Sequence, residues 1–273
     1  MRLSAYVSEG SRKITVQRAG GIKLQADRIL SVRTDRTVYL CGDIAVKVFP
    51  KEEKAGAVFA EAASLAAAAD GGLYVPELVA VRKQKLHWTV ETAYAEGKTL
   101  NQLIAESPDM KERYFADMAE LMAEVHRSGT VFSGRLTERI AENIRAAELD
   151  SGAESRLTAY LYALPKGDAP CHCDFMPENL IRTEKGQICI LDWEDAAMGN
   201  PLADAAFTYL RLTLEGKCRD AEIWLKQCCE VSRCLPERVT EWFPVCAAAL
   251  CRACLAPCRA EEYGMLSGYF AGI

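Results

Sequence analysis

The feature that most restricts the fold of this 273-residue chain is an abrupt change of pattern near residue 97. Before it, short runs rich in β-branched residues are separated by turn residues, which predicts an antiparallel sheet. A run of helix formers at Glu52–Ala69 ends at Gly71-Gly72 and predicts a single helix there. After residue 97, apolar residues recur at helical spacing. We therefore expect an α+β protein with an N-terminal lobe at residues 1–95 and a larger, mainly helical C-terminal lobe at 96–273.

The pattern also predicts individual elements and one β-rich island, Cys171–Trp193, among the later helices. The expected strands are Lys13–Arg18, Ile29–Arg33, Val38–Leu40, Ile44–Phe49, Leu78–Arg82 and Leu86–Glu91, with a tight turn at Cys41–Asp43. The expected later helices are one with Ser107 as N-cap and Pro108 as its first residue, then Thr137–Glu148, Glu154–Leu164, Pro201–Leu214, Ala221–Cys234 and Pro236–Leu255.

Composition excludes several classes of function. The net charge of −5 makes the chain a poor nucleic-acid binder. No apolar run approaches the roughly 18 residues that a membrane span needs, and the first residues lack the apolar core of a signal peptide. We therefore expect a cytoplasmic protein with neither nucleic-acid nor membrane partners.

Twelve cysteines are many for such a chain, and in the cytoplasm they are expected to be reduced. Cys251, Cys254 and Cys258 recur at helical spacing. The simplest interpretation is a row of small buried thiols that pack a helix. A zinc site is the alternative, and the single CxxC with no following histidine supports it weakly.

The β-rich island contains the most informative segment. Leu180–Arg182 and Ile188–Leu191 are short apolar strands joined by a polar turn at Thr183–Gly186, which predicts a β-hairpin. Asn179 precedes the first strand and Asp192 follows the second, so folding the hairpin brings both side chains to its open end. An amide oxygen and a carboxylate are hard ligands that suit Mg²⁺.

Asp174 lies shortly before Asn179 on the connecting loop. Because it stands outside the hairpin, its carboxylate can face a substrate instead of the metal. One general base together with two metal ligands is what phosphorylation of a hydroxyl group requires, since positioning and electrostatics supply most of the catalysis.

These motifs resemble a known family. The pattern His172-x-Asp174-x4-Asn179 is similar to the catalytic loop of the aminoglycoside phosphotransferase and choline kinase family, within the protein-kinase-like superfamily. Asp192-Trp193-Glu194 is similar to the metal-binding triplet of that superfamily, and Gly199–Asp204 to the stretch that follows it. The resemblance implies a bilobal protein-kinase-like fold with Asp174 as catalytic base and Asn179 and Asp192 as metal ligands.

The N-terminal part resembles the same family in order and spacing. Lys47, in an apolar strand, matches the lysine that holds the ATP phosphates, and Glu61 in the next helix matches its ion-pair partner. Glu91, Thr92 and Tyr94 match the hinge that holds adenine. A lysine inside an apolar strand is costly unless its charge is paired. The resemblance implies that ATP and Mg²⁺ bind between the lobes.

Two departures from the family pattern leave an alternative open. Cys173 stands where the family usually has glycine, and the expected phosphate-covering loop at Ser31–Tyr39 contains no glycine. Ser31, Thr34 and Thr37 could serve in its place. These departures motivate a catalytically silent nucleotide-binding or scaffold protein of the same fold. A redox or zinc protein built on the C-terminal thiols is a third possibility.

The resemblance implies transfer of the γ-phosphoryl group of ATP to a hydroxyl of a small molecule, such as an amino-alcohol, an aminoglycoside or a sugar-like acceptor. Glu178, Glu194 and Asp195 flank the motif residues and favour a cationic acceptor. Neither the acceptor nor the oligomeric state follows from the sequence, because this fold serves many acceptors.

Overall fold

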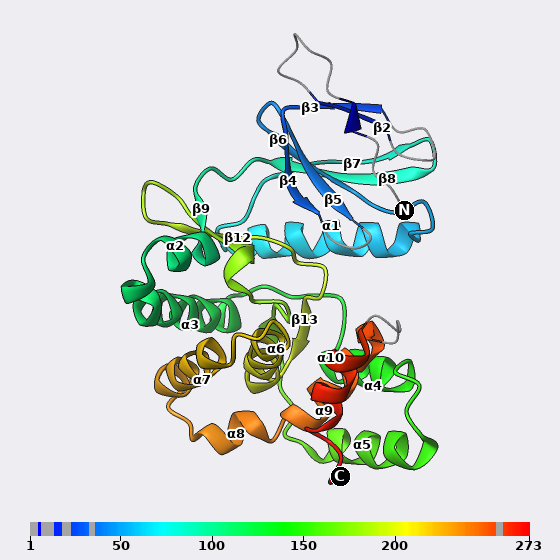
Figure 1. The fold of residues 1–273 in the computed structure, drawn as a ribbon, viewed down its shortest axis with the longest axis vertical. Coiled ribbons are helices and arrows are strands. Elements are labelled where there is room, and N and C mark those ends of the chain that lie inside the picture. Colours follow the sequence, from blue (N-terminus) through cyan, green and yellow to red (C-terminus); the bar gives the residue numbers. More distant parts are fainter. Residues whose placement is uncertain (1–4, 7–13, 18–22, 33–35, 255–258) are drawn as a thin grey trace. The chain divides into compact units, whose positions relative to one another are not determined.

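The chain forms two compact units, each described here by itself (Figure 1). This computed structural model describes residues 5–6, 14–17, 23–32, 36–254 and 259–273. The first unit consists of residues 1–70, 74–97 and 181–194, and the second of residues 71–73, 98–180 and 195–273. Most of the predicted hairpin therefore belongs to the strand-rich unit, although it follows many helices in the sequence.

Apart from the later hairpin, the described residues of the first unit form two antiparallel sheets and one helix. The smaller sheet consists of β1 (Ala5–Tyr6), β2 (Ile14–Gln17) and β3 (Lys23–Ala26). The larger sheet has the order β4-β5-β6-β8-β7, from β4 (Arg28–Val32), β5 (Thr37–Cys41), β6 (Ile44–Val48), β7 (Leu78–Gln84) and β8 (His87–Ala93). The turn between β5 and β6 is at Gly42, whose φ of +66° suits glycine.

Helix α1 (Ala55–Asp70) packs on β7 and β8. Its alanine-rich sequence favours helix, and Val58 at its buried face contacts Phe49 and Val90 in one core cluster. A second cluster contains Tyr39, Val46 and Val48. Alternating strand residues thus supply apolar groups to two cores, and Lys47 lies between Val46 and Val48 on β6.

The hairpin of β11 (Leu180–Arg182) and β12 (Ile188–Ile190) forms as the sequence predicts. Its turn is closed by hydrogen bonds from Thr183 N to Gln187 O and from Gly186 N to Thr183 O, both 2.9 Å. A further bond of 2.9 Å from Ile190 N to Tyr74 O ties β12 to the rest of the first unit.

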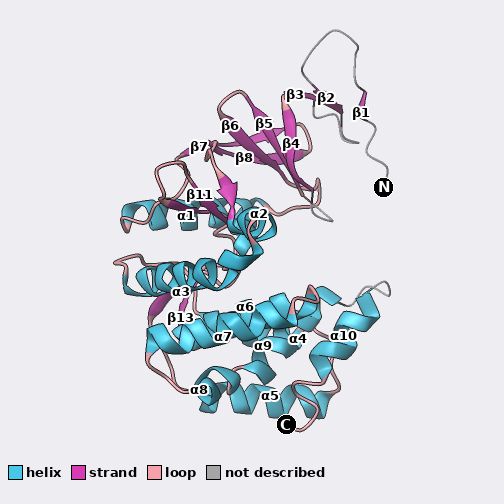
Figure 2. Cartoon of the chain, turned by 60° about the vertical axis from the view of Figure 1, so that its left-hand side comes forward, coloured by secondary structure: helices cyan, strands magenta, loops and turns pink. Residues whose placement is uncertain are grey.

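The second unit is mainly helical (Figure 2). Its α-helices are α2 (Leu100–Glu106), α3 (Lys111–Arg127), α4 (Leu136–Arg145), α5 (Ser151–Ala163), α6 (Pro201–Leu214), α7 (Cys218–Ser232), α8 (Pro236–Thr240), α9 (Phe243–Cys251) and α10 (Ala260–Ser267). Its other elements are β9 (Lys98–Thr99), β10 (Ala169–Cys171), β13 (Ala197–Gly199) and the 3-10 turns η1 (Pro108–Met110), η2 (Pro177–Asn179) and η3 (Arg252–Cys254).

A short ribbon inside the second unit positions the catalytic-loop motif. Strands β10 and β13 pair antiparallel, with Cys171 opposite Ala197. Residue 171 leads directly into the motif, and β13 leads directly into α6. Asn200 caps that helix by accepting a hydrogen bond of 2.9 Å from Leu202 N, and Pro201 follows as its first residue. The start of α6 is thereby fixed beside the loop.

One prediction about helices was wrong, and another was confirmed only in part, since Pro108 does begin a helical turn after Ser107. The helix expected at Pro236–Leu255 is broken into α8, α9 and η3, because Pro244 lacks an N–H group and starts a new helix. Ser107 makes no capping side-chain bond, and η1 precedes α3. The chain caps an unpredicted helix, α2, with Thr99 and Gln102 instead.

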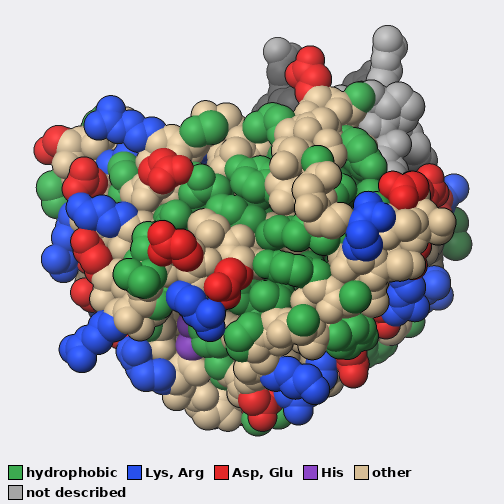
Figure 3. Space-filling view, turned by 90° about the horizontal axis from the view of Figure 1, so that it is seen from below, with side chains coloured by type: hydrophobic (Ala, Val, Ile, Leu, Met, Phe, Trp, Pro, Cys, Tyr) green, Lys and Arg blue, Asp and Glu red, His purple; other side chains and the backbone are tan. Residues whose placement is uncertain are grey.

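The surface of the second unit mixes side-chain types. In Figure 3, apolar side chains lie in the middle of the face, and charged side chains of both signs surround them. No helix among the described residues is both long enough and apolar enough to cross a lipid bilayer.

Candidate active site

Lys47 is the centre of a charged cluster in the first unit. Its Nζ lies 2.7 Å from Glu61 Oε1 and 2.9 Å from Asp192 Oδ1. The Glu194 carboxylate is also 3.7 Å from this Nζ. Strand β6 supplies the lysine, α1 supplies Glu61, and the end of the hairpin supplies the other two groups. The structure thus brings together three of the predicted site residues.

The burial of this cluster alters its titration. Desolvation opposes the charge of Lys47, but the nearby Asp192 and Glu61 carboxylates outweigh it and raise the pKa of the lysine. Burial also raises the pKa of Glu61, although Lys47 opposes that rise. Two carboxylates, those of Glu61 and Asp192, therefore share one ammonium. This group carries an excess of negative charge and is suited to a further cation.

Arg36 is a member of this cluster that the sequence analysis did not identify. Its guanidinium forms ion pairs with Glu194 and, at 3.4 Å, with Glu53. Glu53, just before α1, thus pairs with Arg36, whereas Glu61 in α1 pairs with Lys47. In the expected phosphate-covering loop, Ser31 lies in β4 and Thr37 in β5, while Thr34 lies outside the described residues.

Asp192 has an unusual backbone conformation, with a φ of +63°. A non-glycine residue in this region costs about 1–3 kcal/mol and is common at functional sites. Trp193 Nε1 donates a hydrogen bond of 3.1 Å to Ile190 O and holds the turn after β12. The strained residue presents its carboxylate to Lys47, at 2.9 Å from the Nζ.

The hinge residues lie at the end of β8. Glu91 binds the Arg82 Nε through both carboxylate oxygens, at 3.0 and 3.1 Å. The amides of Ala93 and Tyr94 donate to Glu77 O and Asp43 O, at 2.9 and 2.8 Å. An adenine base that binds here would therefore have to contact the backbone carbonyl oxygens of this segment or the backbone amides after residue 94.

In the second unit, Asp174 and Asn179 lie together. Asp174 is 7% exposed, and its Oδ2 accepts a hydrogen bond of 2.9 Å from Asn179 Nδ2. The same amide nitrogen donates to Asp174 O at 2.8 Å. Because these bonds use the nitrogen, they fix the orientation of the Asn179 carbonyl oxygen, which is the metal-ligand type that the sequence predicted.

The loop backbone before Asp174 is held by its own side chains. His172 Nδ1 accepts a hydrogen bond of 3.2 Å from Asp174 N, and its ring packs edge-on against Phe175. Cys173 has a φ of +65°, a conformation that favours glycine. This explains why the resembling family usually has glycine there, and it shows that the loop forms with cysteine.

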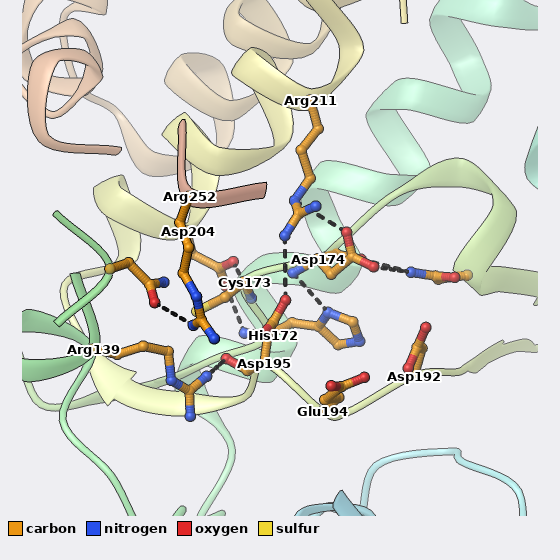
Figure 4. Close-up of polar contacts among 12 residues, drawn as sticks. Arg139, His172, Cys173, Asp174, Asp192, Glu194, Asp195, Asp204, Arg211 and Arg252 are labelled. Carbon is orange, nitrogen blue, oxygen red and sulfur yellow. Dashed lines mark hydrogen bonds and ion pairs between the residues drawn. The ribbon is translucent and has the colours of Figure 1, made fainter. Parts of the chain in front are cut away.

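One face of α6 binds this loop, and Figure 4 shows Arg211 reaching from that helix to Asp174. Asp204, which is fully buried, accepts hydrogen bonds from His172 N at 2.9 Å and from Cys173 N at 2.7 Å. Thr208 Oγ1 donates to Phe175 O at 3.1 Å. Arg211 Nε lies 3.1 Å from Asp174 Oδ1, and its Nη2 lies 3.2 Å from Asp195 Oδ2.

The sequence motif Gly199–Asp204 included Asp204, but sequence reasoning missed Thr208 and Arg211 on the same helix face. Asp204, Thr208 and Arg211 recur at helical spacing in an otherwise apolar helix, and that signal could have found them. It also missed His126, whose Nε2 donates to Asp204 Oδ2 at 3.0 Å. Burial raises the pKa of Asp204, but the hydrogen bond and the charges of His126 and His172 outweigh it, so the net shift is downward.

The thiols do not supply a rival site among the described residues. The single cluster there with three ligand atoms within 4.8 Å of one another is His126, Cys171 and Asp204. Burial raises the pKa of Cys171 well above its usual value, so it stays a thiol, and the Asp204 oxygens already accept hydrogen bonds. Burial likewise raises the pKa of Cys251 to about 12, as expected for a packing thiol; Cys258 lies outside the described residues.

The fold is shared with protein-kinase-like phosphotransferases. A choline/ethanolamine kinase family protein from Mesorhizobium loti matches with a TM-score of 0.61 at 22% identity over 89% of this chain and 85% of that one. Choline kinase LicA from Streptococcus pneumoniae matches with a TM-score of 0.62 at 15% identity over 90% of this chain and 95% of that one. A third match is a thermostable mutant of aminoglycoside phosphotransferase APH(4)-Ia in a ternary complex with ADP and hygromycin B. Its TM-score is 0.66 at 13% identity over 89% of this chain and 91% of that one.

These likenesses establish a kinase-like class of fold, as the sequence motifs predicted. A sequence model of the phosphotransferase enzyme family matches residues 27–233, which is well over half of the chain. The chain therefore belongs to the phosphotransferase enzyme family. No curated protein matches it significantly.

Proposed function

We propose that this protein is an ATP- and Mg²⁺-dependent phosphotransferase that transfers the γ-phosphoryl group of ATP to a hydroxyl group of a small molecule. The main support is the buried Lys47 ammonium, held 2.7 Å from Glu61 and 2.9 Å from Asp192. A buried charge cluster of this kind contributes little stability for its desolvation cost, so a ligand-binding role explains it better. The family and the small-molecule kinases that share the fold support the same reaction.

The first unit would bind the nucleotide. Lys47 would hold the ATP phosphates, and Glu61 would keep the lysine in place. The segment of Glu91, Thr92 and Tyr94 would contact adenine through its backbone. Asp192 and Asn179 have the oxygen ligands that Mg²⁺ prefers. Bound Mg²⁺ would neutralise charge on the phosphates.

The second unit would bind and activate the acceptor. Asp174 would accept the proton of the acceptor hydroxyl while that oxygen bonds to the γ-phosphorus and the bond to the β-phosphate oxygen breaks. Arg211 and Asn179 contact the two oxygens of the Asp174 carboxylate. They fix its direction, and this positioning is a large part of the catalysis.

The test is ADP release with a panel of amino-alcohols, sugars and aminoglycosides. Asp174→Asn keeps the shape of the side chain and removes the base, so we expect turnover to fall about 100-fold or more. Asp168→Asn is the matched control, because the Asp168 side chain is 72% exposed and pairs with Arg135 at the surface. Equal turnover by wild type and Asp174→Asn would contradict the assignment of the base.

The same assay separates the enzyme from a silent scaffold. A scaffold would be stabilised by Mg²⁺-ATP in a thermal-shift measurement but would release no ADP with any acceptor. An active phosphotransferase gives both signals, and Lys47→Met lowers both because the phosphate contact is lost.

A further inference from the structure

The second unit contains a small cavity of about 40 Å³ beside the catalytic loop. Its wall is apolar where Ile140, Phe207 and Leu250 line it, and charged where Arg139 and Arg211 do. Asp195 also lines it, as does Cys173, the residue before Asp174. The cavity is therefore placed where part of an acceptor would lie if Asp174 is the base.

Arg139 carries a charge that no carboxylate of the described chain balances by an ion pair. Its guanidinium donates to the backbone carbonyls of Asp195 and Ala196, the latter at 3.1 Å. Both partners are neutral oxygens, and the side chain is half-buried. A desolvated guanidinium bound only by carbonyls is an incomplete site for an anion.

Arg252, which is exposed, contacts a residue that lines the cavity. Its Nη1 donates to Asn143 Oδ1 at 2.8 Å, again a neutral oxygen. Asn143 lines the cavity and follows Arg139 by one turn of α4, so Arg252 contacts the same face of α4 that carries Arg139. Figure 4 shows Arg139, Arg252 and Arg211 around Asp195.

Two of the acidic residues near the motif, Glu194 and Asp195, are already paired, whereas the buried Glu178 Oε2 accepts no hydrogen bond from the described residues. Asp195 and Asp174 share the Arg211 guanidinium, and Glu194 forms its ion pair with Arg36 in the first unit. These carboxylates are therefore less available to a cationic acceptor than the sequence alone suggested. Of the arginines next to the cavity, Arg139 and Arg252 have no carboxylate partner in the described part of the chain, whereas Arg211 has two.

We propose that the acceptor alcohol carries an oxyanion, either a carboxylate or a phosphate, which Arg139 and Arg252 bind while its hydroxyl reaches Asp174. This inference rests on the proposed function. Arg139 contacts the carbonyl of Asp195, and Arg211 contacts both its carboxylate and Asp174, so the anion and the hydroxyl lie a short distance apart. The acceptor is therefore a short molecule, with few carbon atoms between the two groups.

The experiment compares acceptors that share one alcohol skeleton: glycerol, glycerate, glycerol 3-phosphate and 3-amino-1,2-propanediol. We expect one of the two anions to give the highest kcat/KM, and which of them does so distinguishes a carboxylate from a phosphate. Arg139→Gln and Arg252→Gln should each lower kcat/KM for that anion by about 10- to 100-fold, mainly through KM. The kcat/KM for glycerol should change little in these variants. Arg139→Lys should restore part of the loss for the anion. Arg135→Gln is the surface control.

Two results would overturn the inference. One is a preference for the amino-alcohol or for glycerol, and the other is an equal loss for every acceptor in the Arg139→Gln variant, which would make Arg139 only a support for residues 195–196. The exposed Arg252 keeps the test decisive if Arg139→Gln fails to fold.

Calorimetric binding of glycerate and glycerol 3-phosphate separates this inference from the proposed function. Binding that is lost in Arg252→Gln supports the anion site even if no acceptor is phosphorylated. Absence of anion binding in an enzyme that phosphorylates other alcohols refutes the anion site alone.

Discussion

Replacing Asp204 with asparagine tests whether α6 holds the catalytic loop. The Asp204 Oδ1 accepts from Cys173 N, and an asparagine oxygen can keep that bond. The Asp204 Oδ2 accepts from both His172 N and His126 Nε2, and in asparagine an NH₂ group takes its place. The N–H groups of His172 and His126 then face the N–H donors of that NH₂ group in a fully buried position.

The cost follows from these two lost bonds. A buried donor left without an acceptor costs about 1–3 kcal/mol, so the free energy of unfolding should fall by about 2–6 kcal/mol. Whole domains are stable by only about 5–15 kcal/mol, and the effect is therefore large. Activity should fall as well, because residues 172–174 lose the bonds that fix their backbone.

The measurement is urea or thermal denaturation of wild type and Asp204→Asn at neutral pH. Asp168→Asn makes the same chemical change at an exposed surface pair, and it should alter stability by about 0.5 kcal/mol or less. If Asp204→Asn loses less than about 1 kcal/mol, the hydrogen bonds from α6 do not hold the loop, and the reasoning is refuted.

Three further predictions concern pH and backbone space. The pKa of Asp204 is lowered in the folded protein. The charged carboxylate therefore stabilises the fold above the ordinary pKa of 3.8, and this stabilisation is lost as the pH falls through the folded pKa. The difference in the free energy of unfolding between wild type and Asp204→Asn should shrink in that acid range. The pKa of Lys47 is raised in the folded protein. The difference in the free energy of unfolding between wild type and Lys47→Met should therefore persist below pH 10.5 and disappear as the pH rises through the folded pKa, which denaturation at stepped pH values would show. Gly97→Ala should destabilise by about 2–4 kcal/mol, because Gly97 has a φ of +145° and a Cβ there would lie 2.3 Å from Arg182 O. Gly56→Ala, in α1 with open space around it, should instead stabilise by about 0.5–1 kcal/mol, and equal effects of the two substitutions would contradict this account.

Local signals in the sequence determined much of the fold. Helix α6 begins and ends at the predicted residues, because Asn200 and Pro201 fix its start by contacts within a few positions. The hairpin of β11 and β12 formed as predicted for the same reason, since a polar turn between two apolar strands is a short-range feature. The motifs also identified the family, which the match over residues 27–233 confirmed.

Tertiary structure decided the partners of the charged groups. Helical spacing places Arg211 on one face of α6, but only the packing of that helix under the loop pairs it with Asp174. Arg36 pairs with Glu53, and Lys47 pairs with Glu61, although both glutamates lie in or just before α1. Periodicity defines which side of an element a residue occupies, whereas contacts between distant segments depend on how whole elements pack. For that reason the sequence by itself located the candidate catalytic residues, and the structure alone revealed the arginines that surround them.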